Sequence, residues 1–166
     1  VACVVGAMVS TKKLNLASRS LLLSSSNSEY FSRVFYIMTL GTDREYRQLG
    51  LATALIQQCI QQVREDRSCG ALYLHVLIEN TSAIRFYERL GFWRVQLIPN
   101  YYTINEQKRD CYLYARYFHG NTGHLTVYIV LSAYLNAIWK RIKSPLKFFI
   151  DWRRFRRTTS QYTKSS

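Results

Sequence analysis

The sequence lacks the cysteine pattern of a zinc site or of a disulfide framework. Its four cysteines, Cys3, Cys59, Cys69 and Cys111, are widely spaced, and no two of them form a C-x-x-C pair. Zinc sites draw their ligands from closely spaced pairs, and disulfide-stabilised domains have a denser set of cysteines. We therefore expect no bound metal, and four thiols in a reducing compartment.

A long apolar segment is also missing. The longest apolar run, LTVYIVLSAYLNAIW at Leu125–Trp139, is shorter than the ~20 residues that a transmembrane helix needs. The opening run, VACVVGAMVS at Val1–Ser10, has no basic region before it, so no signal peptide is recognised. We interpret this run as a strand entered in mid-domain, and we expect the sequence to lack the N-terminal part of its fold.

Acidic residues are few. The 166 residues contain 10 Asp and Glu against 23 Lys and Arg, which gives a net charge of +13. The excess is concentrated at the end of the chain, where nine basic residues follow Asn136 and Asp151 is the single acid. Such a basic end predicts an anionic partner, either lipid head groups or nucleic acid.

Hydrophobic periodicity predicts a domain of the α/β class. Strand-like runs cover Val1–Ser10, Tyr30–Leu40, Ala71–Leu77, Phe92–Leu97 and Asp110–Phe118. Helical spacing is present over Gly50–Asp66, and a second helix, capped by Asn80 or Thr81, extends to about Leu90 before Gly91. This order predicts a mixed sheet in which Tyr30–Leu40 and Ala71–Leu77 are parallel, because a crossover helix joins them.

The connections and the strand faces follow from the same pattern. The serine-rich stretch Thr11–Glu29 is typical of a flexible connection, and Pro99–Lys108 is expected to be a loop between strands. Alternation along a strand assigns residues to two faces. One face of Tyr30–Leu40 is expected to carry Val34, Tyr36, Met38 and Leu40, and the other Phe35, Ile37 and Thr39.

The segment DREYRQLGLATALI, Asp43–Ile56, carries the clearest chemical signal. It reads Arg47-x-x-Gly50-x-Ala52 and connects a predicted strand to a predicted helix. A glycine lets the backbone approach a ligand closely, and the first N–H groups of a helix have no internal acceptor. Together with the positive end of the helix dipole, these donors predict a site for pyrophosphate.

This segment resembles the acetyl-CoA pyrophosphate loop of the GCN5-related N-acetyltransferase (GNAT) superfamily, whose pattern is Arg/Gln-x-x-Gly-x-Gly/Ala. A second stretch, LYLHVLIENTSAIRFYERLGF at Leu72–Phe92, is similar to the second signature of that family, and it follows in the family's order. The resemblance implies a GNAT-like mixed sheet flanked by helices. We accordingly divide the chain into an acetyltransferase domain, residues 1–118, and a basic amphipathic tail, residues 119–166.

The resemblance implies a set of residues that bind acetyl-CoA. Backbone groups of one segment pair with the pantetheine arm in the family, the loop holds the pyrophosphate, and the second helix adds further contacts. The matching residues are Leu40, Gly41 and Thr42, then Gln48, Leu49, Gly50, Leu51, Ala52 and Thr53, and finally Asn80, Tyr87, Glu88, Arg89 and Leu90. Judged from the residues alone, Asn80 also suits a helix cap and Tyr87 a core aromatic.

The resemblance also implies the catalytic pair Tyr36 and His75, which lie on adjacent strands beside the thioester in the family. An α-amino group, with a pKa near 7.7–8.0, must lose its proton before it attacks. His75 or Tyr36 could accept that proton directly or through water. Bulk water is the alternative base, in which case both residues only position the peptide. Tyr87 is a further candidate, as the general acid that protonates the departing thiolate.

Peptide recognition is assigned by resemblance to Met38, Tyr101 and Tyr102, and in the family the loop that carries both tyrosines is linked to self-association. The segments YIMTLG and IPNYYTI are similar to a Golgi-associated branch of the family that acetylates the N-termini of proteins. That similarity implies substrates that begin with Met, typically transmembrane proteins, and a peripheral position on the cytosolic face of the Golgi membrane.

Other functions stay open at this stage. One is acetylation of lysine side chains, for example on histones, which would make the protein a chromatin regulator. Another is a catalytically inactive, membrane-bound module that only binds acyl-CoA. The sequence does not separate these alternatives from N-terminal acetylation.

The tail combines aromatic and aliphatic residues with Lys and Arg, and a polar stripe runs through Ser132, Asn136, Lys140 and Lys143. This pattern is typical of an interfacial helix on an anionic membrane. Packing on the domain or on a partner is the alternative. A nucleic-acid partner is disfavoured, because no recognised nucleic-acid-binding motif accompanies the charge.

Overall fold

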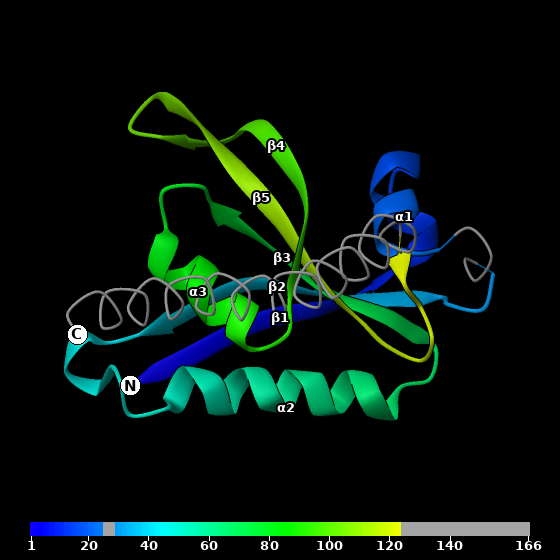
Figure 1. Cartoon of the computed structure of the whole chain (residues 1–166), viewed down its shortest axis with the longest axis horizontal. Helices are drawn as coiled ribbons and strands as arrows, with labels where there is room; N and C mark the ends of the chain where they lie inside the picture. The colour runs from blue at the N-terminus through cyan, green and yellow to red at the C-terminus, as the bar shows by residue number, and fades with distance from the viewer. Residues whose placement is uncertain (25–28, 124–166) are drawn as a thin grey trace, which may run out of the picture. The chain divides into compact units, whose positions relative to one another are not determined.

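The computed structural model describes residues 1–24 and 29–123. Within them the chain forms five strands, three α-helices and two short 3₁₀ turns (Figure 1). In chain order these are β1 (Ala2–Ser10), η1 (Thr11–Lys13), α1 (Leu16–Leu22), β2 (Arg33–Thr42), η2 (Arg44–Tyr46), α2 (Leu51–Glu65), β3 (Cys69–Leu77), α3 (Thr81–Arg89), β4 (Trp93–Ile104) and β5 (Gln107–Tyr117). The predicted tail helix lies outside the described residues.

The strands form one mixed sheet in the order β1-β2-β3-β5-β4. β2 and β3 are parallel, as the crossover helix α2 requires, and the other neighbours are antiparallel. This confirms the expected α/β architecture and the predicted parallel pair. Among the described residues, no helix is long and apolar enough to cross a membrane.

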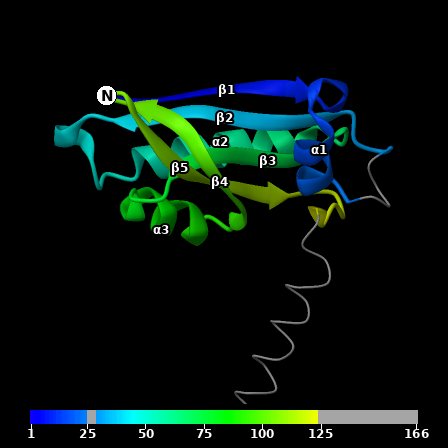
Figure 2. The same ribbon diagram turned by 90° about the horizontal axis from the view of Figure 1, so that it is seen from above.

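Helices cover both faces of the sheet, and the two cores lie between them (Figures 1 and 2). α2 packs on the first face through four buried residues, Ile56, Cys59, Ile60 and Val63. Tyr87 of α3 belongs to the same core, whereas Leu22 of α1 belongs to the core of the opposite face. The helical spacing predicted over Gly50–Asp66 is therefore the spacing of the residues that α2 buries against the sheet.

A bulge in β2 changes the predicted faces of that strand. Val5 of β1 pairs with Thr39 and Gly6 pairs with Ile37, so Met38 has no partner on β1. One extra residue reverses the alternation beyond it. Leu40 accordingly packs against the core beneath α2, and the prediction that it shares a face with Val34 and Tyr36 is wrong.

The stretch Thr11–Glu29 was expected to be a flexible connection, and for residues 11–24, which the structure describes, this prediction is wrong. It contains α1, which begins at the cap Asn15, whose side chain accepts a hydrogen bond from the backbone N–H of Ser18 at 2.7 Å. Leu22 is fully buried, and its carbonyl accepts a 2.8 Å hydrogen bond from the side chain of Asn121. The leucines within the serine-rich stretch supply the buried contacts that order it.

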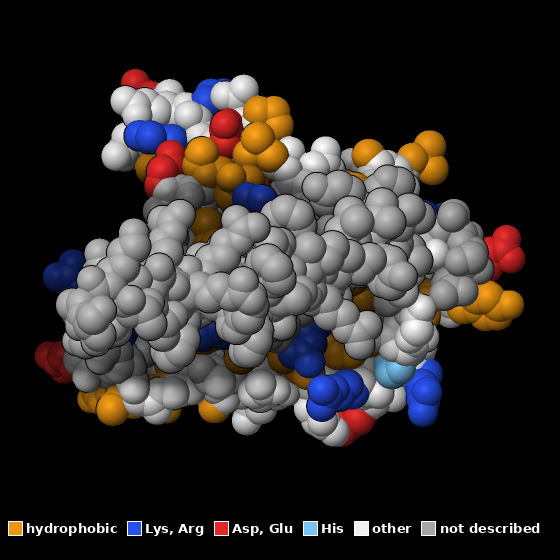
Figure 3. Space-filling model, viewed as in Figure 1, with side chains coloured by type: hydrophobic (Ala, Val, Ile, Leu, Met, Phe, Trp, Pro, Cys, Tyr) orange, Lys and Arg blue, Asp and Glu red, His pale blue; other side chains and the backbone are white. Residues whose placement is uncertain are grey.

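The expected loop Pro99–Lys108 is mostly strand. β4 continues to Ile104 and β5 starts at Gln107, while Asn105 and Glu106 form the turn with φ of 49° and 63°. Two consecutive positive φ angles match the twist of paired strands, as is typical of a two-residue hairpin turn. The end of this hairpin projects away from the other strands (Figure 1). In Figure 3 its projecting end carries charged side chains beside hydrophobic ones. Tyr101 and Tyr102 consequently belong to a strand.

Candidate active site

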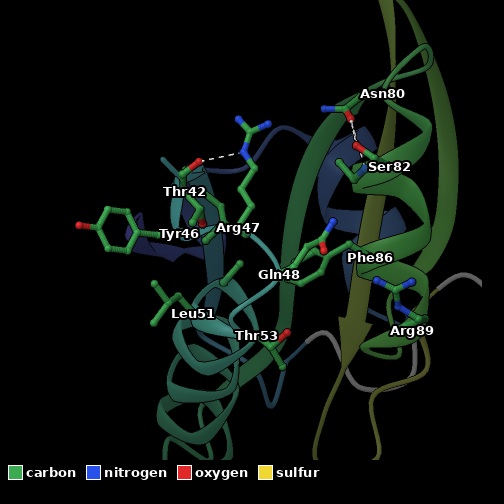
Figure 4. A pocket seen from close by; sticks show the side chains of 15 residues that line it. Thr42, Tyr46, Arg47, Gln48, Leu51, Thr53, Asn80, Ser82, Phe86 and Arg89 are labelled. Atoms are coloured by element: carbon green, nitrogen blue, oxygen red, sulfur yellow. Dashed lines mark hydrogen bonds between the residues drawn. The ribbon is translucent and has the colours of Figure 1, made fainter. Parts of the chain in front are cut away.

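A cleft of about 620 Å³ opens where the C-terminal end of β2, the loop before α2, and α3 meet (Figure 4). It is lined by most of the residues that were predicted to bind a cofactor. They are Leu40, Gly41, Thr42, Gln48, Gly50, Leu51, Ala52, Thr53, Asn80 and Arg89. The structure therefore brings together two sequence motifs that are separated along the chain.

The loop before α2 adopts the backbone that its glycine permits. Gly50 caps the helix with a φ of 79°, in the left-handed region, and a Cβ built there would meet no atom within 4 Å. Glycine is thus required for the backbone angle and not for space. Because α2 begins at Leu51, the N–H groups of Leu51, Ala52 and Thr53 have no acceptor within the helix. These donors suit an anion.

Two arginines add positive charge to this cleft. Arg47 donates from Nε to the carbonyl oxygen of Thr42 at 3.1 Å, which fixes the side chain beside the end of β2. Arg89 lines the cleft from α3 (Figure 4). Charge from both the loop and α3 favours a ligand that carries several negative charges.

Sequence reasoning missed the lining side chains of Tyr46, Ser82, Ala83 and Phe86, and it quoted Arg47 only as part of a motif. For α3, helical periodicity could have identified the lining residues. Ser82, Phe86 and Arg89 stand at spacings of four and three, so they share one face of the helix. This face borders the cleft.

Four other predicted cofactor residues are not among the residues that line the cleft. Leu49 is 66% exposed, whereas Tyr87 is buried and its ring contacts Phe92 edge-on. The carboxylate of Glu88 accepts a 2.8 Å hydrogen bond from the hydroxyl of Tyr114. The carbonyl of Leu90 accepts a hydrogen bond from the guanidinium of Arg116. A cofactor contact for these four residues stays a prediction.

The predicted catalytic pair meets across β2 and β3. The register of the parallel strands places Tyr36 opposite Tyr73, and the Tyr36 hydroxyl lies 3.2 Å from Nδ1 of His75. The ring of Tyr73 stacks on that of Tyr36, with centroids 4.7 Å apart and planes inclined by 18°. Sequence reasoning had given Tyr73 no role.

The two tyrosines predicted to contact substrate converge on the same histidine. The ring of Tyr101 stacks on His75 at 4.3 Å, and its hydroxyl lies 3.3 Å from Nδ1. Tyr102 donates its hydroxyl to the backbone carbonyl of His75 at 3.4 Å. Met38, the third predicted substrate residue, is 52% exposed at the bulge of β2.

Burial determines the proton chemistry of this cluster. It lowers the pKa of His75 from 6.5 to about 4, because the charged imidazolium is poorly solvated there. Burial, and then the hydrogen bond with Tyr101, raises the pKa of Tyr36 well above 10. At neutral pH, His75 is a neutral imidazole and Tyr36 keeps its proton. The pair therefore has one group that can accept a proton and one that can donate one.

None of the residues that line the cleft is a cysteine. Cys59, Cys69 and Cys111 are buried and Cys3 is exposed, and burial raises the pKa of the Cys69 and Cys111 thiols to about 11. Within residues 1–24 and 29–123, no group of three or more His, Cys, Asp or Glu side chains is placed to hold a metal ion.

The model of the acetyltransferase (GNAT) family matches residues 4–92, which is more than half of the chain, and the chain belongs to this family. Among individual proteins, it is 36% identical over 115 residues to N-alpha-acetyltransferase 60 of Xenopus tropicalis, covering 68% of this chain and 46% of that protein. It is 31% identical over 123 residues to histone acetyltransferase MCC1 of Arabidopsis thaliana, covering 74% of this chain and 50% of that protein.

Solved structures of NAA60 from Arabidopsis thaliana share the fold. The complex with acetyl-CoA is 32% identical with a TM-score of 0.64, and covers 72% of this chain and 66% of that one. The complex with a bisubstrate analogue is 31% identical with a TM-score of 0.61, and covers 70% and 64%. The chain spans about half the length of the Xenopus relative and less than two thirds of the NAA60 structures.

The lowered pKa of His75 predicts how stability depends on pH. Between pH 6.5 and about 4 the unfolded chain binds a proton that the folded chain does not, so stability falls as the pH falls through this window. We expect His75→Leu to lose less stability than wild type between pH 7 and pH 5. Urea denaturation of both proteins at the two pH values measures this difference, and equal losses would contradict a buried, neutral His75.

Proposed function

We propose that this protein transfers the acetyl group of acetyl-CoA to the N-terminal α-amino group of other proteins. The observation that carries the proposal is the combination of an anion-binding cleft with the Tyr36–His75 pair. In support, the chain belongs to the GNAT family, and the relatives named above include N-alpha-acetyltransferase 60.

The cleft suits acetyl-CoA. The backbone donors of Leu51, Ala52 and Thr53 take the pyrophosphate, while Arg47 and Arg89 offset its charge. The end of β2 provides backbone groups for the pantetheine arm, because its pairing with β3 ends at Ile37 while Leu40, Gly41 and Thr42 pair with β1 on the other edge. The solved structure of Arabidopsis NAA60 with acetyl-CoA supports this choice of ligand.

The Tyr36–His75 pair performs the proton transfer. The substrate amine loses a proton to neutral His75, directly or through water, and its nitrogen attacks the carbonyl carbon of the thioester. The C–S bond then breaks, and the thiolate leaves and takes up a proton. In the tautomer that this step needs, Nδ1–H of His75 donates to the hydroxyl oxygen of Tyr36, and Nε2 is free to accept the proton of the amine. Tyr36 thus orients the imidazole through their hydrogen bond. Tyr87 remains the proposed proton donor to the thiolate.

Met38, Tyr101 and Tyr102 form the proposed substrate side. The two tyrosines stand over His75, where the N-terminus of a peptide must arrive to be deprotonated. The bisubstrate analogue in the Arabidopsis NAA60 structure supports a peptide substrate. We extend the proposal to substrates whose N-termini begin with Met, typically transmembrane proteins. We also propose self-association through the β4–β5 hairpin. The proposed location is the cytosolic face of the Golgi.

Acetylation of lysine side chains is the second function to be tested. The named similarity to an Arabidopsis histone acetyltransferase favours it. A lysine amine has a pKa near 10.4, so it needs more help to lose its proton than an α-amine does. His75, with a pKa of about 4, is a weak base for that task.

The deciding experiment offers labelled acetyl-CoA and two peptides to the protein. The first begins with a free Met-Leu and contains no lysine, and the second has a blocked N-terminus and internal lysines. We expect label only in the first peptide. Label only in the second would assign a lysine acetyltransferase, and bound acetyl-CoA without transfer to either peptide would indicate an inactive acyl-CoA-binding module.

Substitution of Gly50 tests the anion-binding loop. We expect Gly50→Ala to weaken acetyl-CoA binding by about tenfold, because alanine disfavours the left-handed backbone by roughly 1 kcal/mol and displaces the N–H donors. Gly120→Ala is the matched control, since Gly120 also has a φ of 78° and open space, but does not line the cleft. Isothermal calorimetry measures both affinities, and equal losses would argue against the loop as the binding site.

Deletion of residues 125–166 tests the proposed membrane role of the tail. We expect the shortened protein to lose binding to vesicles that contain anionic lipids, because nine of the basic residues are removed, and to keep its affinity for acetyl-CoA. Vesicle flotation, with a DNA gel shift of the full chain alongside, measures the outcome. If the shortened protein still floats with the vesicles, the tail is not the membrane anchor.

A further inference from the structure

The β4–β5 hairpin contains a second bulge, opposite Asp110, which the sequence analysis did not predict. Ile98 pairs with Cys111 and Tyr102 pairs with Arg109, so three residues of β4, Pro99 to Tyr101, face the single residue Asp110 of β5. A bulge of this kind interrupts the ladder and redirects the side chains that it contains.

Asp110 holds the middle of this bulge. Asn100 adopts a left-handed backbone with a φ of 55°, a conformation that asparagine tolerates better than most residues. Its backbone N–H, which has left the ladder, donates to Oδ1 of Asp110 at 2.8 Å. The carbonyl of Asp110 in turn accepts a 3.3 Å hydrogen bond from the N–H of Ile78, just beyond β3. Hydrogen bonds to a carboxylate are among the stronger ones in proteins.

The bulge places Tyr101 next to the catalytic pair. Tyr101 directly follows Asn100, and its ring lies 4.3 Å from that of His75 with planes inclined by 18°. Its hydroxyl reaches Nδ1 of His75, the same nitrogen that the hydroxyl of Tyr36 contacts. The position of Tyr101 therefore determines both how far His75 is shielded from water and which groups surround its nitrogen.

We propose that Asp110 is a positioning residue for the acetyl transfer: through its hydrogen bond to Asn100 it fixes the bulge that holds Tyr101 over His75. Asp110 acts on the proton acceptor without touching it. This inference deepens the proposed function, on which its catalytic consequence rests, and it concerns a residue for which sequence reasoning gave no role.

The test reads the protonation of His75 directly by NMR. The titratable side chains that contact His75 are Tyr36 from β2, Tyr73 from its own strand, and Tyr101 and Tyr102 from β4. If Tyr101 moves away from His75, the other three tyrosines stay in place, but water reaches the imidazole. We expect Asp110→Ala to raise the pKa of the His75 imidazole from about 4 toward 6.5. Asp110→Asn, whose amide oxygen can still accept from Asn100, is expected to restore the low value.

Turnover gives the second readout in the full chain. We expect Asp110→Ala to lower kcat by about ten- to a hundredfold, with little change in KM for acetyl-CoA, because the proton acceptor is displaced while the cleft is intact. In a Tyr101→Ala background the same substitution is expected to add nothing. Glu79→Gln, which breaks the neighbouring exposed ion pair with Arg109, is the control and should change neither readout.

Three results would overturn the proposal: a His75 titration unchanged by Asp110→Ala, an Asp110→Asn variant as impaired as Asp110→Ala, or a full effect that persists in the Tyr101→Ala background. Asp110→Ser, too short to reach Asn100, takes the place of the alanine variant if the latter does not fold. The titration needs no turnover. A wild-type protein that transfers no acetyl group would thus count against the proposed function and leave the test of Asp110 intact.

Discussion

Between β2 and β3 the backbone hydrogen bonds join parallel strands, and the other features of the site depend on that pairing. A parallel neighbour demands a crossover, so the chain must leave β2 through a loop and enter α2 at Gly50. The same register sets Tyr36 opposite Tyr73 and brings His75 within hydrogen-bond distance of the Tyr36 hydroxyl. The anion-binding loop and the proton-transfer pair are thus two results of one strand pairing.

Two bulges in the sheet place side chains where regular strand pairing would not put them. The bulge at Met38 leaves that residue without a partner on β1, and it moves Leu40 to the face beneath α2. The longer bulge around Asn100 places an aromatic ring over His75. Each bulge costs ladder pairs, one residue at Met38 and three around Asn100, and each redirects a side chain at the site.

Most of the fold and much of the site could be predicted because they depend on local pattern. The helical spacing of α2 and the cap at Asn80 are short-range signals, and the structure contains both of them. The bulge at Met38 could not be predicted, since it appears only when two strands are paired. The order of α1 depends on Leu22 finding a partner in Asn121, almost a hundred residues away. Contacts across such a distance leave no local pattern.

The side chain of Asn121 ties together segments that are remote in the chain. It is 4% exposed, and it donates to the carbonyls of Leu22 at the end of α1 and of Gly70 at the start of β3, at 2.8 and 2.9 Å. None of these segments can separate from the others without stranding a buried polar group. They are therefore expected to open together. The amide protons of α1 would then exchange with solvent cooperatively with those at the start of β3. Together with the buried Leu22 and the hydrogen bond from the Tyr117 hydroxyl to the carbonyl of Leu21, this amide couples a short peripheral helix to the sheet.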